Sequence, residues 1–358
     1  MAILINIALY GAAVFAVLYI IARFYLRGSD LSAHDTPIPV TFDSPAPSEA
    51  ANGVEKYLIE RMSVPATLAA TRERFTELGL SREFDCKFVS ETAEFDGLSV
   101  PGEWTVFEGA DHSKRLYYIH GGAFTLGSPV SHRPIIANIA KRTGCVVFAP
   151  DYRLMPENRR KASILDSRAA YQWMLKNGPD SPSDASKVAV AGDSAGGNLA
   201  LCLINWLRDS NLRLPDAVIA LSPGTDGTGS GPSVRSNLAT DHMLRRLATP
   251  FLKIPTWLLM WVMWAVNRIV PSSKLISPLH DDLGGLPPTL IHASTAEILY
   301  DDAKRFTNKA VSQGSPVTLQ SWPHLCHVWQ MFDEVLPEAN HAIDEIAAFM
   351  HQHGVAKK

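Results

Sequence analysis

The stretch "KVAVAGDSAGGNLALCLINWL", residues 187–207, determines the fold. Its first residues are a short apolar run typical of a buried strand, and the run from Gly196 onward has the composition of a helix. Between them lies the motif G-x-S-x-G, formed by Gly192, Ser194 and Gly196. A strand, a tight turn and a helix together form the setting in which this motif exposes a reactive serine hydroxyl at the positive end of the helix. The motif also recurs by chance, with the serine as a simple helix cap, so other segments must decide between the two interpretations.

Further strand-like runs lie on both sides of this stretch. Three of them follow one another closely enough to predict an antiparallel start to a sheet, at about 86–93, 102–108 and 115–120. The later runs lie at 144–150, 187–192, 217–222, 288–293 and 316–322. Helix-length segments such as 162–177 and 196–208 separate these later runs, and this alternation implies right-handed parallel crossovers. The pattern predicts a doubly wound α/β sheet of about eight strands, with functional residues just beyond the carboxyl ends of the strands.

A second motif ends the strand at 115–120. The sequence "YYIHGGAFTLG" places His120, Gly121, Gly122 and Ala123 directly after the strand. Because glycines carry no side chain, the backbone N–H groups of Gly121, Gly122 and Ala123 can face a developing oxyanion, and the N–H of Ala195 would complete an oxyanion hole. We expect His120 to support this loop through hydrogen bonds. A plain flexible loop would leave unexplained why both motifs stand at strand ends in the order that this chemistry needs.

Six segments in sequence resemble one family, the hormone-sensitive-lipase-like branch of the α/β hydrolases, which includes bacterial carboxylesterases and the arylacetamide deacetylases. The resemblance covers roughly residues 85–350 and rests on "HGGAF", "PDYRLMPE" (150–157), "GDSAGG", "SPLHDDLGGLPP" (277–288), "STAEILYDD" and "WPHLCHVWQMF". It implies an α/β-hydrolase fold with a helical cap, and no metal or organic cofactor. It also implies that Asp151, Tyr152 and Arg153 support the wall of the site.

A serine nucleophile needs a base, which in this fold is a histidine after the last strand. His324 and His327 both lie there. His327 begins "HVWQ", which is similar to the family pattern, and the turn before it leaves room for its ring to reach Ser194. We therefore expect His327 to be the base and His324, which follows Pro323, to be a turn residue.

Three carboxylates compete for the role of the acid that orients the base. Asp301 and Asp302 fall in the first turn of a predicted helix, where the helix dipole already favours a negative charge. Glu297 precedes that helix, in the loop after the strand at 288–293, and has no evident structural role. The family resemblance places its acid, commonly Asp, at this position, so we expect Glu297 to orient His327 despite its extra methylene group.

The N-terminus contains a 21-residue apolar run, residues 2–22, broken only by Asn6. About 20 such residues cross a hydrocarbon core, and no basic residue precedes the run as a cleaved signal peptide would require. We expect an uncleaved transmembrane anchor, and Arg23 and Arg27 then place the catalytic domain in the cytoplasm by the positive-inside rule.

The rest of the chain divides by composition. Residues 28–52 are rich in Pro, Ser and Asp and predict a linker, and the folded part is expected to begin near Val54. Residues 53–82 predict two helices broken at Pro65, which would belong to the cap. The catalytic domain is expected to comprise 83–223 and 271–352.

Residues 224–270, called the insert below, show no strand pattern and are expected to complete the cap. Their most apolar part is "TWLLMWVMWAV" (256–266), which is too short to span a bilayer. It predicts either a buried wall of the cap over the site or a patch that dips into the membrane beside the anchor. A wall that contains Trp257, Met260, Trp261 and Trp264 would favour apolar esters.

Composition excludes several other classes. The net charge of −3 is not that of a nucleic-acid-binding protein, and the four cysteines form no CxxC pair, which argues against a zinc site or a disulfide framework. The sequence therefore predicts a serine carboxylester hydrolase acting on a hydrophobic small molecule. An arylamide deacetylase using the same residues is the nearest alternative, and a non-catalytic receptor on the same fold is a distant one.

Overall fold

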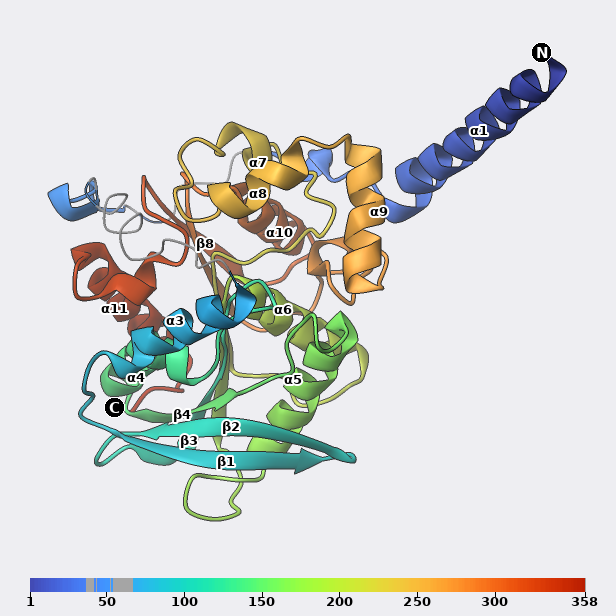
Figure 1. The fold of residues 1–358 in the computed structure, drawn as a ribbon. Helices are drawn as coiled ribbons and strands as arrows, with labels where there is room; N and C mark the ends of the chain where they lie inside the picture. Colours follow the sequence, from blue (N-terminus) through green and yellow to red (C-terminus); the bar gives the residue numbers. More distant parts are fainter. Residues whose placement is uncertain (37–41, 43, 52, 54–66, 358) are drawn as a thin grey trace.

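The computed structural model describes residues 1–36, 42, 44–51, 53 and 67–357 (Figure 1). These residues form an eight-stranded sheet in the order β1-β2-β4-β3-β5-β6-β7-β8. The strands are β1 Lys87–Phe95, β2 Leu98–Val106, β3 Asp111–Ile119, β4 Cys145–Pro150, β5 Lys187–Asp193, β6 Ala217–Leu221, β7 Thr289–Ser294 and β8 Val317–Trp322. All eight predicted strands are thereby confirmed, within a few residues at their ends.

The sheet is antiparallel only at one edge. β1 pairs with β2, and β2 pairs with β4, in antiparallel register. β3 is parallel to both β4 and β5, and every pair from β5 to β8 is parallel. The prediction that the third strand continues an antiparallel start is therefore wrong. α4 (Arg133–Thr143) connects β3 to β4, and β4 then lies between β2 and β3. β2 and β3 are therefore neighbours in the sequence but not in the sheet.

Helices cover both faces of the sheet, which explains why the central strands are apolar throughout. α4 (Arg133–Thr143) and α11 (Pro337–Gln352) pack on one face, and α5 (Arg160–Met174), α6 (Ala195–Asp209) and α10 (Tyr300–Ser312) pack on the other. Along β3, Leu116 and Tyr118 face α4, whereas Tyr117 and Ile119 face α5 and α6. In Figure 1, α4 and α11 lie to the left of the sheet and α5 to the right.

One helix of the predicted N-terminal pair is described. α3 (Leu68–Leu80) begins after Thr67, whose hydroxyl accepts a hydrogen bond from the N–H of Ala70 at 3.2 Å. The other predicted helix lies outside the described residues. α3 packs on the 3₁₀ turn η3 (Val130–His132), and Gly79 permits this contact because a Cβ there would overlap the carbonyl of Val130.

The insert is helical in the structure. It contains α7 (Ser233–Ser236), α8 (Arg245–Leu252) and α9 (Thr256–Asn267) between β6 and β7. On α9 only Met260 and Asn267 are buried, and Leu258, Trp264 and Val266 are exposed. The helix that the sequence shows as apolar on every side is therefore half covered.

The N-terminal helix α1 (Ala2–Ile21) continues into the π-helix η1 (Ala22–Leu26) and extends away from the other elements (Figure 1). Within the described residues it is the one helix long and apolar enough to cross a membrane. Ala22 and Leu26 pack against Met260 of α9, so the base of α1 is attached to the insert.

Residues 28–52 form more than a spacer where the structure describes them. Leu31, next to the turn η2 (Ser32–His34), is buried in the core between α6 and α10. Asp35 forms an ion pair with Arg305 at 2.6 Å, and the Ser48 hydroxyl donates to Glu338 at 3.1 Å. The folded part therefore begins before Val54, contrary to the prediction from composition.

Candidate active site

Ser194 lies at the sharp turn between β5 and α6, as the motif predicts. Its backbone has φ +52° and ψ −115°, a conformation that L residues rarely adopt. A Cβ at Gly192 would overlap the carbonyl of Gly196, and a Cβ at Gly196 would overlap the carbonyl of Ile119. The two glycines are therefore required for this turn to pass beneath the neighbouring strand.

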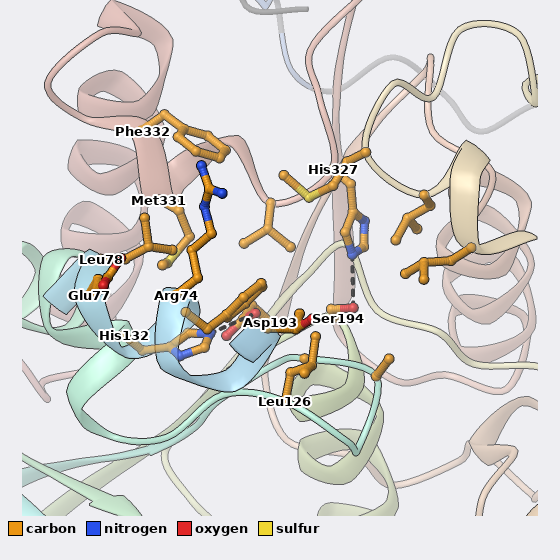
Figure 2. A pocket seen from close by; sticks show the side chains of 18 of the residues that line it. Arg74, Glu77, Leu78, Leu126, His132, Asp193, Ser194, His327, Met331 and Phe332 are labelled. Atoms are coloured by element: carbon orange, nitrogen blue, oxygen red, sulfur yellow. Dashed lines mark hydrogen bonds and ion pairs between the residues drawn. The ribbon is translucent and has the colours of Figure 1, made fainter. Parts of the chain in front are cut away.

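Ser194, His327 and Glu297 form one chain of hydrogen bonds. The Nε2 atom of His327 lies 2.8 Å from the Ser194 hydroxyl, a contact drawn in Figure 2, and its Nδ1 lies 2.6 Å from a Glu297 carboxylate oxygen. The other carboxylate oxygen of Glu297 accepts the N–H of Ser294 at 2.8 Å. Glu297 is completely buried and His327 nearly so. His324 is an exposed turn residue, as expected.

The two aspartates that follow serve the insert instead of the histidine. Asp301 accepts the N–H of Ser233 at 2.6 Å, and Asp302 accepts the N–H groups of Thr225 and Asp226 at 2.7 and 2.9 Å. Both lie in the first turn of α10 but are buried, so the dipole explanation was incomplete. Burial and the nearby Asp226 carboxylate raise the pKa of Asp302 to about 8.

The buried carboxylate of Glu297 raises the pKa of His327 and so makes its ring a stronger base. Burial lowers the pKa of His327, but the hydrogen bond and charge of Glu297 outweigh burial, so that the pKa lies above its ordinary value. Burial raises the pKa of Glu297, and the hydrogen bond to His327 acts in the opposite direction.

The loop after β3 contains backbone N–H groups near Ser194, but Gly121 does not supply one. The N–H of Gly121 donates to Asp193 at 3.0 Å, so the prediction that it faces an oxyanion is wrong. Within the described part of the chain, the N–H groups of Gly122, Ala123 and Ala195 form no hydrogen bond. Gly122 and Ala123 have φ values of +111° and +52° and line the cavity beside Ser194.

Sequence reasoning missed the network that holds this loop. The buried Asp193 carboxylate accepts the Tyr118 hydroxyl at 2.8 Å and lies 3.4 Å from His132 Nε2, a pair visible in Figure 2. Only its place inside the G-x-S-x-G motif, directly before the serine, could have drawn attention to it.

His120 and Tyr152 support the same loop. Burial lowers the pKa of His120 to about 3, so its ring is neutral, and its Nδ1 lies 2.8 Å from the Gly121 carbonyl oxygen. Its ring stacks on Tyr152, whose hydroxyl donates to the His120 carbonyl at 2.8 Å. Both residues therefore have the supporting contacts expected for them.

The insert also holds the loop that contains Glu297. Asp241, which is buried, accepts the N–H of Ile298 at 2.9 Å and the N–H of Leu244 at 2.7 Å. Asn237 donates to the carbonyl of Glu297 at 2.9 Å. No sequence pattern indicates that Asp241 meets Ile298 or that Asn237 meets Glu297, because these contacts join segments more than fifty residues apart.

A cavity of about 550 Å³ opens above Ser194 and His327. Its walls come from α3, the loop after β3, the start of α8 and the turn η5 (Trp329–Phe332). They include Ala70, Phe75, Leu78, Leu126, Met243, Leu244, Leu247, Val328, Met331 and Phe332. No residue of α9 lines this cavity, so of the two alternatives predicted for 256–266 the buried wall over the site is wrong. Among the described residues, no group of three His, Cys, Asp or Glu side chains could hold a metal ion.

Comparisons with known proteins agree with this architecture. Residues 116–331 match the family model described as alpha/beta hydrolase fold. An acetyl-hydrolase of Streptomyces hygroscopicus is 36% identical over 253 residues, which are 69% of this chain and 78% of that protein. The carboxylesterase NlhH of Mycobacterium tuberculosis is 30% identical over 300 residues, which are 81% of this chain and 92% of that protein.

The fold is also that of a solved esterase from the bacterial hormone-sensitive lipase family. The two structures are 33% identical in sequence, with a TM-score of 0.73 over 86% of this chain and 99% of that one. The chain therefore belongs to the α/β hydrolase family, in its hormone-sensitive-lipase-like branch.

Proposed function

We propose that the protein hydrolyses carboxylic esters through an acyl-enzyme formed on Ser194. The observation that carries this proposal is the chain of hydrogen bonds from the Ser194 hydroxyl through His327 to Glu297, at 2.8 and 2.6 Å. His327 removes the proton as the serine oxygen attacks the ester carbonyl, and Glu297 orients the ring and stabilises its positive charge. His327 then protonates the leaving alcohol, and water releases the acid by the reverse sequence.

The oxyanion of the tetrahedral intermediate would be bound by the N–H groups of Gly122, Ala123 and Ala195. Their lack of other hydrogen bonds within the described part of the chain supports this role. Such donors are effective because they are already oriented before charge develops, and the loss of one typically lowers the rate by about a hundredfold or more. Asp193 acts as a positioning residue, since its bond to the Gly121 N–H fixes the loop that carries two of the donors.

The lining of the cavity favours an apolar acyl or alcohol group. About half of the residues that line it are aliphatic, aromatic or methionine, and Ser194, His327 and Asp193 are the polar groups beside the nucleophile. The wall also contains charged side chains, those of Glu73, Arg74, Glu77 and Arg246. Esterases and an acetyl-hydrolase among the relatives support an ester substrate. We further propose that α1 is an uncleaved membrane anchor with the catalytic domain on the cytoplasmic side, because Arg23 and Arg27 follow the apolar run.

Substitution of the nucleophile tests the proposal. Ser194→Ala should abolish hydrolysis of p-nitrophenyl butyrate by the purified protein, whereas Ser210→Ala, an exposed serine at the end of α6, should leave the rate unchanged. A fluorophosphonate probe should label the native protein and not Ser194→Ala, which separates an enzyme from a non-catalytic receptor. Retention of activity in Ser194→Ala would contradict the proposal, and a matched butyranilide would report any preference for amides.

A further inference from the structure

We propose that the outer faces of α8 and α9 bind the surface of an anionic bilayer, and that the substrate is an ester dissolved in that bilayer. The second part rests on the ester hydrolysis proposed above. The surface, called the cap face below, is defined by its exposed apolar and basic side chains. The apolar ones are Leu247, Phe251, Leu258, Trp264 and Val266. The basic ones are Arg235 on the adjoining α7, Arg245 and Arg246 on α8, and Lys253 and Arg268 at the helix ends, and of all these only Leu247 and Arg246 also line the cavity.

The length of α1 fixes where α9 must lie. The 20 residues of α1 extend about 30 Å, which is just the thickness of a hydrocarbon core, so its last turns must lie within or at the edge of the membrane if it spans. Those turns contact α9: the Trp257 ring lies 5.0 Å from the Phe15 ring, and the Trp261 indole N–H donates to the Leu18 carbonyl at 3.1 Å. An anchor that spans therefore carries the first half of α9 to the depth of the bilayer surface, where tryptophan is favoured.

The exposure of α9 agrees with that position. Leu258, Trp264 and Val266 are 38%, 37% and 54% exposed, on a helix that contains no charged residue from Thr256 to Asn267. An uncharged helix with large apolar side chains exposed in this way is unfavourable in water and is typical of an interfacial helix. Since α1 and η1 already contact α9 at Trp257, Met260 and Trp261, the bilayer that receives α1 is the partner that continues this contact.

The distribution of charged residues in the insert also favours contact with an anionic bilayer. The insert contains five basic residues, and all are exposed. Its two acidic residues, Asp226 and Asp241, are 7% and 1% exposed and are engaged by backbone N–H groups. The exposed charge of the insert is thus entirely positive although the chain as a whole has a net charge of −3, which suits anionic lipid head groups.

The cap face continues into the cavity through α8. Leu247 is 50% exposed and also lines the cavity, and Phe251, one turn later, is 45% exposed outside it. Only Lys253, Ile254 and Pro255 separate α8 from α9. An ester leaving the bilayer at α9 would therefore meet apolar side chains as far as the cavity above Ser194. Figure 1 shows α9 beside the base of α1, with α8 next to α7 and farther from α1.

Quenching of tryptophan fluorescence tests the membrane contact without any assay of activity. The full-length protein would be placed in vesicles of phosphatidylcholine and phosphatidylglycerol, with or without bromine on the acyl chains. We expect bromolipids to quench part of the emission and Trp264→Phe to remove a share of that quenched part, whereas Trp173→Phe on α5 should leave the quenched part intact. An identical quenched part in native protein and Trp264→Phe would overturn the proposal.

Two substrates test the route. The variant Phe251→Asp/Leu258→Asp alters the cap face outside the cavity, and Phe95→Asp on β1, with a similar 41% exposure, is the matched control. In vesicles we expect about a tenfold or greater loss on p-nitrophenyl palmitate, with p-nitrophenyl acetate hydrolysis within about twofold of native. Equal losses on both esters, or no loss on either, would overturn the route.

A single substitution of an exposed basic residue keeps the proposal testable if the double variant fails to fold. We expect phosphatidylglycerol in the vesicles to stimulate hydrolysis of p-nitrophenyl palmitate by the native protein. Lys253→Glu should lose most of that stimulation while still hydrolysing p-nitrophenyl acetate at the native rate. A stimulation equal to that of the native protein would contradict the role of anionic lipid. If the native protein hydrolyses neither ester, the proposed function fails, and the quenching result still decides whether the cap face binds the bilayer.

Discussion

At the scale of the residue, the orientation of His327 depends on which carboxylate it meets. Glu297 lies 2.6 Å from its Nδ1, whereas Asp301 binds the N–H of Ser233 in the insert. We expect Glu297→Gln to lower kcat by about a hundredfold or more, because the amide cannot stabilise the imidazolium and can hold the wrong tautomer. Steady-state kinetics on p-nitrophenyl butyrate would measure the loss.

Asp301→Asn is the matched control for this substitution. An asparagine oxygen can still accept the Ser233 N–H, so kcat should change little even if the melting temperature falls. An equal loss of kcat in both variants, with both folded, would mean that Glu297 is not the orienting acid.

The pH dependence of the rate follows from the same pair. His327 must be neutral to accept the serine proton, so kcat/KM should fall as pH drops through its pKa. Glu297 raises that pKa above the ordinary value despite burial, so the fall should begin at a higher pH than for an unperturbed histidine. In Glu297→Gln the charge is lost and burial remains, so the midpoint of the residual activity should move to lower pH. A midpoint that does not move would contradict the coupling.

Candidate site residues could be predicted from the sequence where a motif or a position in a loop distinguishes them from their neighbours. Ser194 and His327 stand at strand ends in the required order, and Glu297 is the carboxylate without a place on a helix. Gly121 was misassigned because a sequence does not show that the Asp193 side chain folds back onto its N–H. Asp241 and Asn237 were missed because their contacts depend on how the insert folds over the acid loop.

At the scale of the element, α3 determines the shape of the cavity entrance. Phe75 and Leu78 line the cavity, and Gly79 seats the helix on Val130. Alanine at Gly79 gains about 1 kcal/mol in helix propensity, but its Cβ overlaps the Val130 carbonyl, and such overpacking costs about 1–3 kcal/mol. We expect Gly79→Ala to displace α3, raising KM several-fold while kcat stays within about twofold. Kinetics on p-nitrophenyl butyrate would measure both.

The neighbouring Leu80 supplies the control for Gly79. Its side chain is 62% exposed and does not line the cavity, so Leu80→Ala should leave KM and kcat near native values. A fall in kcat with unchanged KM in Gly79→Ala would place the effect of the substitution at the reacting atoms instead of the entrance.

The positions of strands and helices could be predicted from local sequence patterns, but the strands and helices that each one contacts could not. Eight strands and the helices around the motif follow from apolar runs and turn residues. The pairing of β3 depends on β4, which arrives later in the chain and inserts beside it. Of the two positions predicted for α9, the wall over the cavity is wrong because α9 instead contacts α1 and η1, which lie more than two hundred residues earlier in the chain.

At the scale of the whole molecule, α1 is attached to the catalytic domain and is more than a tether. Ala22 and Leu26 fill the contact with Met260, and Leu31 and Asp35 continue the attachment to α6 and α10. Removal of the apolar run as a signal peptide would strip the cover from α9. This arrangement favours an uncleaved helix, and mass spectrometry of the membrane-bound protein should recover a peptide from within residues 1–22.

The side of the membrane can be tested on the same protein. Arg23 and Arg27 follow the apolar run, so we expect the catalytic domain to face the cytoplasm. In sealed vesicles with their cytoplasmic face outward, added protease should digest the domain without detergent. A lumenal marker protein in the same vesicles should stay intact. Protection of the domain until detergent is added would place it on the opposite side, and the cap face would then meet the lipids of that leaflet instead.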